Sequence, residues 1–151
     1  MLGGVEIAGA PRLYGHSDGD VVLHAVADAL LGAAGLGDLG RLAPADERTP
    51  RGIASSELVR AVLARLAAAA WRPASVDLVI VAARPHLGPH LEAIRSSVAA
   101  LLGLASDRVS VKASTGNLQG AEGEGRAITA QAIVTIEPAP VQQDSRQVGE
   151  R

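Results

Sequence analysis

Aromatic side chains are almost absent from this chain of 151 residues, which has no Phe, one Trp and one Tyr. Its core therefore has to be built from Ala, Leu, Val and Ile, and it offers almost no rings on which bases could stack. This argues against the RNA-binding and single-strand-binding modules that depend on aromatic platforms. A formal net charge of −2 also supplies no basic surface for a polyanion. We expect no nucleic acid among the partners.

The length and the remaining composition fit a single domain, because a chain of this size can bury one core but not two. The absence of Cys excludes a disulfide scaffold, a thiolate zinc site and a cysteine nucleophile. No apolar run approaches the roughly 18–20 residues of a membrane span. The N-terminus also lacks the pattern of a signal peptide. We expect a cytoplasmic protein without a membrane partner.

Strand-like and helix-like periodicities alternate along the chain. Alternating or continuously apolar runs predict strands at 4–8, 76–83, 108–113 and 127–136. Apolar residues at helical spacing predict helices from Asp18 to about Ala34, from Ser55 or Ser56 to about Ala70, and from the 85–89 turn to Leu102. The segments 37–52 and 116–125 are predicted loops. The pattern indicates an α+β fold, an α/β sandwich with helices on one face of a small sheet, and leaves the strand order open.

The composition changes after Glu137. Pro138-Ala139-Pro140 opens a polar stretch that includes Gln142-Gln143-Asp144-Ser145-Arg146. Such a stretch cannot bury much apolar surface. We therefore expect one domain over residues 1–137 and a disordered tail over 138–151.

The densest polar cluster is His16-Ser17-Asp18-Gly19-Asp20, which leads into the first predicted helix. Asp20, His24 and Asp28 are spaced i, i+4, i+8, so they would share one helical stripe, and the helix start would favour anions. In the simplest interpretation Ser17 or Asp18 caps the helix and His24 is solvated. In the alternative, His24 is a zinc ligand oriented by carboxylates. A zinc site would then need at least two further ligands from elsewhere.

Two other segments could contact a ligand. Lys112-Ala113-Ser114-Thr115-Gly116-Asn117 follows a strand, so it could hold phosphate oxygens or form an ordinary polar turn. Ala82-Ala83-Arg84-Pro85-His86-Leu87-Gly88-Pro89-His90 is a rigid turn that could present backbone groups to a nucleobase. The Gly-rich run 120–125 precedes a strand and lacks a Gly-Lys-Ser/Thr ending, so it is no nucleotide-binding fingerprint.

The motif His-Ser-Asp-Gly-Asp-x-x-x-His-Ala-x-x-Asp-Ala-Leu-Leu-Gly-Ala at 16–33, followed by Gly37-Asp38-Leu39-Gly40, resembles the 2-C-methyl-D-erythritol 2,4-cyclodiphosphate synthases. The likeness continues through 82–90, 109–115 and the Gly-Glu-Gly at 123–125, and it covers roughly residues 3–137.

This resemblance implies an enzyme, a phosphorus–oxygen lyase of non-mevalonate isoprenoid biosynthesis. It would convert 4-diphosphocytidyl-2-C-methyl-D-erythritol 2-phosphate into the cyclic diphosphate and release CMP. The resemblance also implies a homotrimer with active sites between subunits, a zinc ion and a second divalent cation, magnesium or manganese. The alternative is a catalytically impaired relative that acts as a nucleotide-binding or interaction trimer.

The resemblance also assigns roles by position. It makes His24 a zinc ligand and gives transition-state stabilisation to His16 and Thr115. Phosphate binding would fall to Ser17, with the erythritol part contacted by Asp38, Leu39, Gly40 and, more loosely, 44–46 including Asp46. Asp20 and Asp28 would orient His24 or meet substrate hydroxyls. The diphosphate loop would contain Ser114, Gly116 and Asn117, and the cytidine pocket Ala82, Ala83, Arg84, Pro85, His86, Leu87 and Gly88.

Three departures from the family pattern bear on these expectations. The family's first strand supplies an Asp-x-His pair with two more zinc ligands, and residues 1–15 contain no such pair. Either the start lies too far downstream or the chain is truncated, and we expect weak zinc binding and an exposed sheet edge. Asn117 replaces a Glu at the second cation in a loop about two residues shorter, so it contributes no charge there. Ala43 replaces a Phe near the substrate loop.

Overall fold

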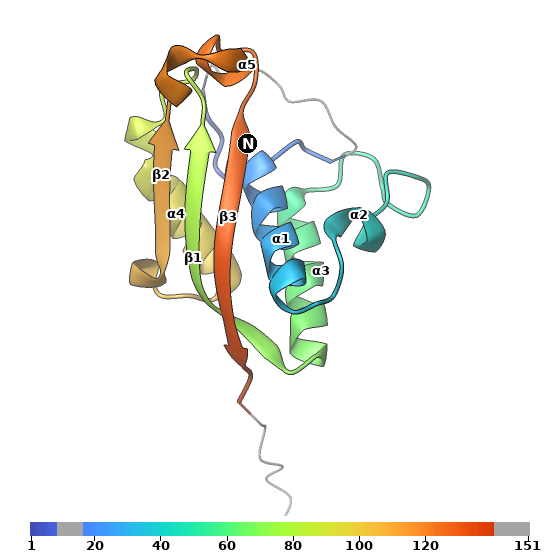
Figure 1. Ribbon diagram of the computed structural model, residues 1–151. Helices are drawn as coiled ribbons and strands as arrows, with labels where there is room; N and C mark the ends of the chain where they lie inside the picture. The colour runs from blue at the N-terminus through green and yellow to red at the C-terminus, as the bar shows by residue number, and fades with distance from the viewer. Residues whose placement is uncertain (9–16, 141–151) are drawn as a thin grey trace, which may run out of the picture.

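A computed structural model describes residues 1–8 and 17–140 of the chain (Figure 1). In chain order, its elements are α1 (Val21–Ala33), α2 (Leu39–Leu42), α3 (Ser55–Ala68), β1 (Trp71–Val81), η1 (Gly88–His90), α4 (Leu91–Leu102), η2 (Ser106–Arg108), β2 (Val109–Ser114), η3 (Gly116–Leu118), α5 (Gly120–Gly123) and β3 (Thr129–Pro138).

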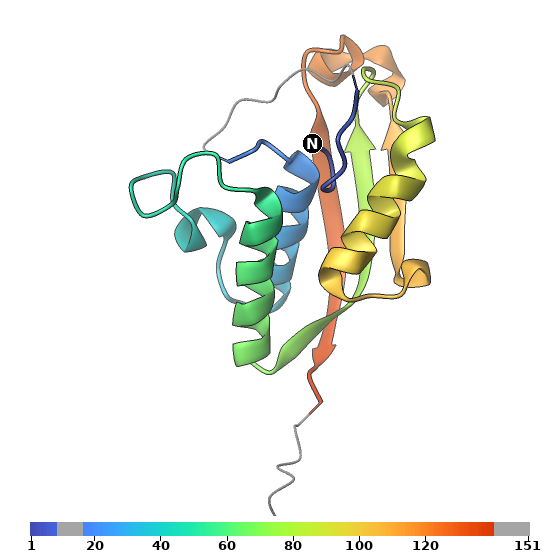
Figure 2. The ribbon, with the colours of Figure 1, turned by 180° about the vertical axis from the view of Figure 1, so that it is seen from behind.

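The three strands form one mixed sheet in the order β2-β1-β3. β1 runs parallel to β2, with Val76 opposite Val109, and antiparallel to β3, with Leu78 opposite Ala132. Seen from behind, α4 crosses in front of β1 and β2 (Figure 2), while α1 lies beside β3 and α3 packs against α1. The predicted α+β class, with helices on one face of a small sheet, is confirmed.

The core between the helices and the sheet is aliphatic, as the near absence of aromatic residues requires. Leu30 of α1, Val62 of α3, Leu78 of β1 and Ile94 of α4 are all fully buried. Along β1, the buried side chains are those of Val76, Leu78 and Ile80. Because side chains alternate along a strand, the residues between them lie on the opposite face, which is helix-free in the part of the chain that the structure describes.

The predicted strand at 4–8 is wrong. In its place, Leu2 and Val5 form an isolated antiparallel bridge across a tight turn. Gly3 and Gly4 occupy the turn with φ values of 60° and 78°, a region that glycine adopts without strain. A Cβ on Gly3 would stand 2.6 Å from Cγ2 of Ile94, so the turn is also packed closely against α4.

The other predicted elements exist with shifted ends. The predicted loop 37–52 contains the short helix α2, and α1 begins at Val21 rather than Asp18. β1 begins at Trp71, ahead of the predicted Val76, and β3 extends to Pro138, the first residue of the expected tail. The N–H of Ala139 then donates to the Ala70 carbonyl at 2.8 Å. Most of the expected tail, 141–151, lies outside the described residues.

In the described part of the chain, every helix is too short or too polar to cross a membrane.

Candidate functional site

The first turn of α1 holds His24 next to Ser17. His24 is half-buried, and its Nε2 lies 3.1 Å from the Ser17 hydroxyl. The same hydroxyl accepts a hydrogen bond from the Gly19 N–H at 3.2 Å, which leaves its own proton free to point at an unprotonated Nε2. The predicted proximity of the Ser-Asp-Gly-Asp motif and His24 is therefore present, whereas His16 lies outside the described residues.

Asp20 is the N-cap of α1 and is fully buried. One carboxylate oxygen accepts from the N–H groups of Val22 and Leu23 at 3.2 and 3.1 Å. The carboxylate also accepts from Gly3 at 2.8 Å and from Gly4 at 2.7 Å. These four bonds direct the carboxylate to the backbone of its own chain, away from His24.

Asp28 lies one turn after His24 and is exposed. Its carboxylate accepts the Leu39 N–H at 2.7 Å and so fixes the turn that contains Asp38, Leu39 and Gly40. Asp38 is the N-cap of α2, where it accepts from the Arg41 N–H at 2.9 Å. Leu39 is only 7% exposed, so the turn is anchored by an apolar side chain as well. The predicted erythritol segment is therefore attached directly to α1.

Asp46 lies in the loop between α2 and α3. Its carboxylate binds the Arg48 guanidinium, with the closest approach at 2.6 Å, and also accepts the Arg48 N–H. This interaction holds the pKa of Arg48 above its ordinary value. Because both groups are largely solvent-exposed, the pair contributes little stability.

The 82–88 turn and the Gly-rich loop meet at the carboxyl end of β1 (Figure 1). The Ala82 N–H donates to the Ser114 carbonyl, and the Ala83 N–H donates to the Glu122 carbonyl, both at 2.9 Å. The turn itself has a cis Arg84–Pro85 bond. Ala82 and Leu87 are buried, so they anchor the turn, whereas Arg84, His86 and Gly88 are exposed.

The hydroxyl segment after β2 is open to solvent. Ser114, Thr115 and Asn117 are exposed, and the Ser114 hydroxyl accepts from the Gly116 N–H at 3.1 Å. Asn117 has a φ of 56°, which Asn tolerates better than most residues. The segment is a tight polar turn beside the 82–88 turn, so its side chains are accessible to a ligand.

Glu122 is a residue that the sequence reasoning did not single out. Its side chain accepts the Thr129 hydroxyl at 2.6 Å, and this bond holds the pKa of Glu122 below its ordinary value. The Glu122 carbonyl also accepts the Ala83 N–H, so Glu122 connects the Gly-rich loop to the end of β1 and to the start of β3. The only sequence signal was the Gly-Glu-Gly pattern beside it, which does not specify a partner.

The predicted site residues thus form two groups on the described chain. One group surrounds the start of α1 with Ser17, His24, Asp28 and the 38–40 turn. The other caps the end of β1 and β2 with 82–88 and 114–117. In Figure 1, β3 runs between α1 and the other two strands.

A metal would need more ligands than the first group offers. Within residues 1–8 and 17–140, no three His, Cys, Asp or Glu side chains are grouped so that they could hold a metal ion. His24 contributes one imidazole, and a structural or catalytic zinc site requires at least three protein ligands. The described residues alone therefore do not fit a zinc ion.

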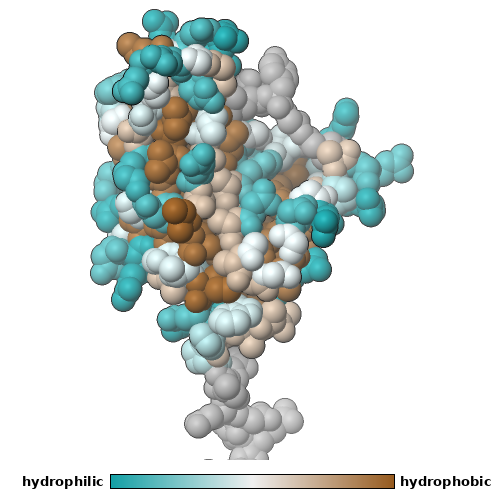
Figure 3. Space-filling view, in the orientation of Figure 1, coloured by the Kyte–Doolittle hydropathy of each residue, from teal (hydrophilic) through white to brown (hydrophobic). Residues whose placement is uncertain are grey.

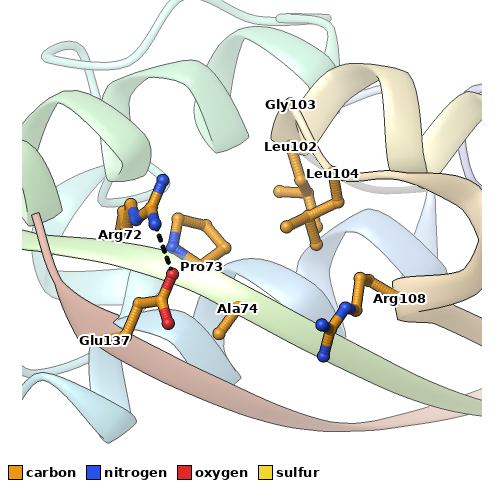
Figure 4. Close-up of a pocket in the computed structure, with 8 residues that line it drawn as sticks. All are labelled: Arg72, Pro73, Ala74, Leu102, Gly103, Leu104, Arg108 and Glu137. Carbon is orange, nitrogen blue, oxygen red and sulfur yellow. Dashed lines mark ion pairs between the residues drawn. The ribbon is translucent and has the colours of Figure 1, made fainter.

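A separate pocket lies at the opposite end of β1, where α4 ends (Figure 4). An ion pair of 2.7 Å between Arg72 and Glu137 lines it, with Arg108 on the other side. None of the predicted site residues lines this pocket.

The α+β fold, the histidine motif at the first helix and the turn beside a Gly-rich loop together point to one protein family. The chain belongs to the YgbB family, whose profile matches residues 1–137. It is 47% identical over 139 residues to the 2-C-methyl-D-erythritol 2,4-cyclodiphosphate synthase of Chromobacterium violaceum, with 92% of this chain and 88% of that protein covered.

Solved structures agree with this assignment. The chain is similar to a 2C-methyl-D-erythritol-2,4-cyclodiphosphate synthase in a CDP-bound form, with a TM-score of 0.75, 36% identity, and 91% and 89% of the two chains covered. It is also similar to the bifunctional IspDF of Campylobacter jejuni, with a TM-score of 0.86 and 33% identity. That match covers 91% of this chain and 37% of the other.

Proposed function

We propose that the protein is a 2-C-methyl-D-erythritol 2,4-cyclodiphosphate synthase of non-mevalonate isoprenoid biosynthesis. Its substrate would be 4-diphosphocytidyl-2-C-methyl-D-erythritol 2-phosphate, and its products the cyclic diphosphate and CMP. The observation that carries the proposal is the Ser17–His24 contact at the start of α1, with the 38–40 turn fixed to the same helix by Asp28. The 47% identity to a named synthase supports it.

The reaction is an intramolecular displacement between two phosphates. An oxygen of the 2-phosphate attacks the phosphorus that carries the erythritol oxygen, a new P–O bond forms, and the bond to the CMP phosphate breaks. The attacking phosphate is already ionised, so no strong base is needed. The main barrier is repulsion between like charges, which hydrogen-bond donors placed around the phosphates reduce.

We assign the phosphate contacts to the two polar groups. Ser17 would donate its hydroxyl to a phosphate oxygen, and His16 and Thr115 would stabilise the transition state. Ser114, Gly116 and Asn117 would line the diphosphate. The exposure of Ser114 and Asn117 in the turn after β2 supports this role.

We assign the remaining substrate contacts to the 38–40 turn and the 82–88 turn. Asp38, Leu39, Gly40 and Asp46 would contact the erythritol part. Asp28 would support the 38–40 turn, and Asp20, whose carboxylate accepts four backbone N–H groups, would hold the start of α1 in place. The cytidine would bind the 82–88 turn. Buried Ala82 and Leu87 hold that turn rigid, which limits the entropy lost on binding.

We infer a homotrimer from the helix-free face of the sheet. On this face Ile133 is 72% exposed, and Val79 and Val81 lie on the neighbouring strand. Figure 3 shows apolar surface over the sheet. Exposed apolar surface on a sheet favours association. Assembly would also allow the two polar groups of neighbouring subunits to share one active site.

The family resemblance includes zinc and a second divalent cation, and we propose both as cofactors, with His24 as a zinc ligand. Because no three His, Cys, Asp or Glu side chains are grouped together in the described residues, the purified chain of 151 residues should retain zinc well below one equivalent. Elemental analysis checks this expectation. One equivalent of zinc would show that residues outside the described ranges, or another subunit, complete the site.

The proposed reaction is tested by incubating the substrate with the protein and magnesium and following the phosphorus atoms by NMR. Formation of the cyclic diphosphate together with an equal amount of CMP supports the proposal. CDP binding without turnover would instead support the impaired relative, and neither binding nor turnover would reject both functions. The single domain over 1–137 and the cytoplasmic location stay predictions.

A further inference from the structure

The loop that brings Ser17 to His24 is attached to the segment before α3. The backbones of Ser17 and Ile53 form a parallel bridge. The Asp18 N–H donates to the Ile53 carbonyl at 3.1 Å. Two segments far apart in the sequence are thus joined directly beside the histidine.

The side chain of Asp18 adds a second attachment, to the first residue of α3. Its carboxylate accepts the Ser55 N–H at 3.1 Å and the Ser55 hydroxyl, and it also accepts the Asp20 N–H at 3.2 Å. Ser55 is fully buried. Burial opposes ionisation of Asp18, but the hydrogen bonds, chiefly those from Ser55, outweigh it and hold the pKa of Asp18 below its ordinary value.

This contact replaces a cap that α3 lacks. The N-cap residue of α3 is Ala54, which has no side chain able to accept a hydrogen bond. A carboxylate at a helix start satisfies unpaired N–H groups and interacts favourably with the helix dipole. Asp18 supplies that carboxylate from another segment, so the start of α3 and the 17–19 loop stabilise each other.

We infer that Asp18 and Ser55 are positioning residues that hold the Ser17 hydroxyl against the His24 ring. Neither side chain is bonded to the ring itself, and both act through the backbone of the 17–19 loop. The geometric part of this inference stands on the contacts above, and only its effect on turnover rests on the proposed function.

The geometric test uses the full chain with ¹⁵N-labelled histidine at one fixed pH. The chain has four histidines, so the Nε2 signal of His24 can be assigned with a His24→Gln variant. Ser17→Ala defines the shift that follows loss of the hydroxyl. We expect Asp18→Ala and Ser55→Ala to shift the signal in the same direction, and Ser55→Thr, which keeps a hydroxyl, to restore it.

Glu92→Gln is the matched control. Glu92 lies in the first turn of α4, and its carboxylate also accepts hydrogen bonds, from Arg95 at 2.7 and 2.9 Å. Removing this charge should leave the His24 signal unchanged. If Asp18→Ala does not fold, Asp18→Asn takes its place. An unchanged His24 signal in folded Asp18 and Ser55 variants overturns the inference.

The kinetic test separates positioning from a general loss of stability. Misplacement of the Ser17 hydroxyl should lower kcat by about 10- to 100-fold in Asp18→Asn, with little change in KM. Loss of folded protein alone would reduce the active fraction without moving the His24 signal of the folded molecules. If the wild type is inactive but the variants show the expected shifts, the proposed function is rejected and the inference is kept. If the wild type is active but the His24 signal is unchanged in the variants, the proposed function is kept and the inference is rejected.

Discussion

At the start of α1, acidic side chains bind backbone N–H groups of their own chain. Asp20 accepts four such bonds and Asp28 accepts one from the 38–40 turn. The sequence spacing predicted a stripe shared by Asp20, His24 and Asp28. Since Asp20 precedes the helix as its N-cap, its side chain turns toward the Gly3–Gly4 segment instead. Spacing along a helix cannot reveal this, because the partner lies in a different segment.

Asp20→Asn should lower the free energy of unfolding by about 2–4 kcal/mol, because buried N–H groups lose a charged acceptor and the helix loses its cap. Urea denaturation measures the change. Asp38→Asn is the comparison, because Asp38 caps α2 with a half-exposed side chain, and it should cost less than about 1 kcal/mol. Equal effects would mean that the buried bonds of Asp20 contribute no more than an exposed cap.

The lowered pKa of Asp18 predicts a specific pH dependence of stability. An Asp in the unfolded chain titrates near about 3.9. The stability contributed by Asp18 is therefore fully present above that pH and is lost as the pH falls through the lower folded-state value. The difference in unfolding free energy between wild type and Asp18→Asn should be constant near neutral pH and shrink below about pH 4. Urea titrations at several pH values check this, and a difference that grows on acidification would contradict it.

At the scale of elements, the aliphatic periodicity predicted the three long helices and the three strands, because each buries a continuous apolar face. It did not predict how far β1 extends, because Pro73 weakens the strand signal. In the structure β1 pairs with β2 only from Val76 onward, and the pairing with β3 shifts register between Pro73 and Ser75. A proline is tolerated where one edge of the strand is unpaired. The short helices α2 and α5, in segments predicted as loops, carry too few residues for a periodicity to show.

Substitution by alanine should stabilise the protein at one helical glycine and destabilise it at another. Gly32 lies near the end of α1, and a Cβ added there would have no atom within 4 Å apart from its chain neighbours and the backbone of its own helix, so Gly32→Ala should raise the unfolding free energy by about 0.5–1 kcal/mol. A Cβ on Gly123, in α5, would lie 2.2 Å from the carbonyl carbon of Leu118. Gly123→Ala should therefore destabilise the Gly-rich loop by about 1–3 kcal/mol.

Thermal unfolding measures the first change, and hydrogen exchange at the Ala83 N–H, which is bonded to the Glu122 carbonyl, measures the second. Faster exchange at Ala83 in Gly123→Ala is the expected result. Unchanged exchange would show that the loop relaxes without disturbing the 82–88 turn.

At the scale of the whole molecule, the two groups of predicted site residues lie on different sides of β3, and none of the helices in residues 1–8 and 17–140 covers the second face of the sheet. The sequence named most residues of both groups through a family resemblance. It could not give their separation, because that depends on strand order, which periodicity does not specify. It also could not predict that Glu122 binds Thr129 or that Ser55 binds Asp18, because these contacts join segments that are separate in the sequence.

Ile133→Lys tests the proposed assembly. Ile133 lies opposite Asp77 on the open face, so a lysine there meets a carboxylate and should leave the folded subunit intact. If subunits associate through this face, the substitution should convert trimers into monomers, as measured by light scattering during size-exclusion chromatography. A variant that stays trimeric would place the interface elsewhere.

The single tryptophan has a practical consequence for experiments in solution. Trp71 opens β1 and is paired with Pro138, while the proposed cytidine turn follows Val81 at the other end of the same strand. Eleven residues of extended strand separate the two ends by about 33 Å. Intrinsic fluorescence should therefore report melting of the sheet faithfully but stay silent when a nucleotide is titrated, so affinity has to be read with an added chromophore or by calorimetry.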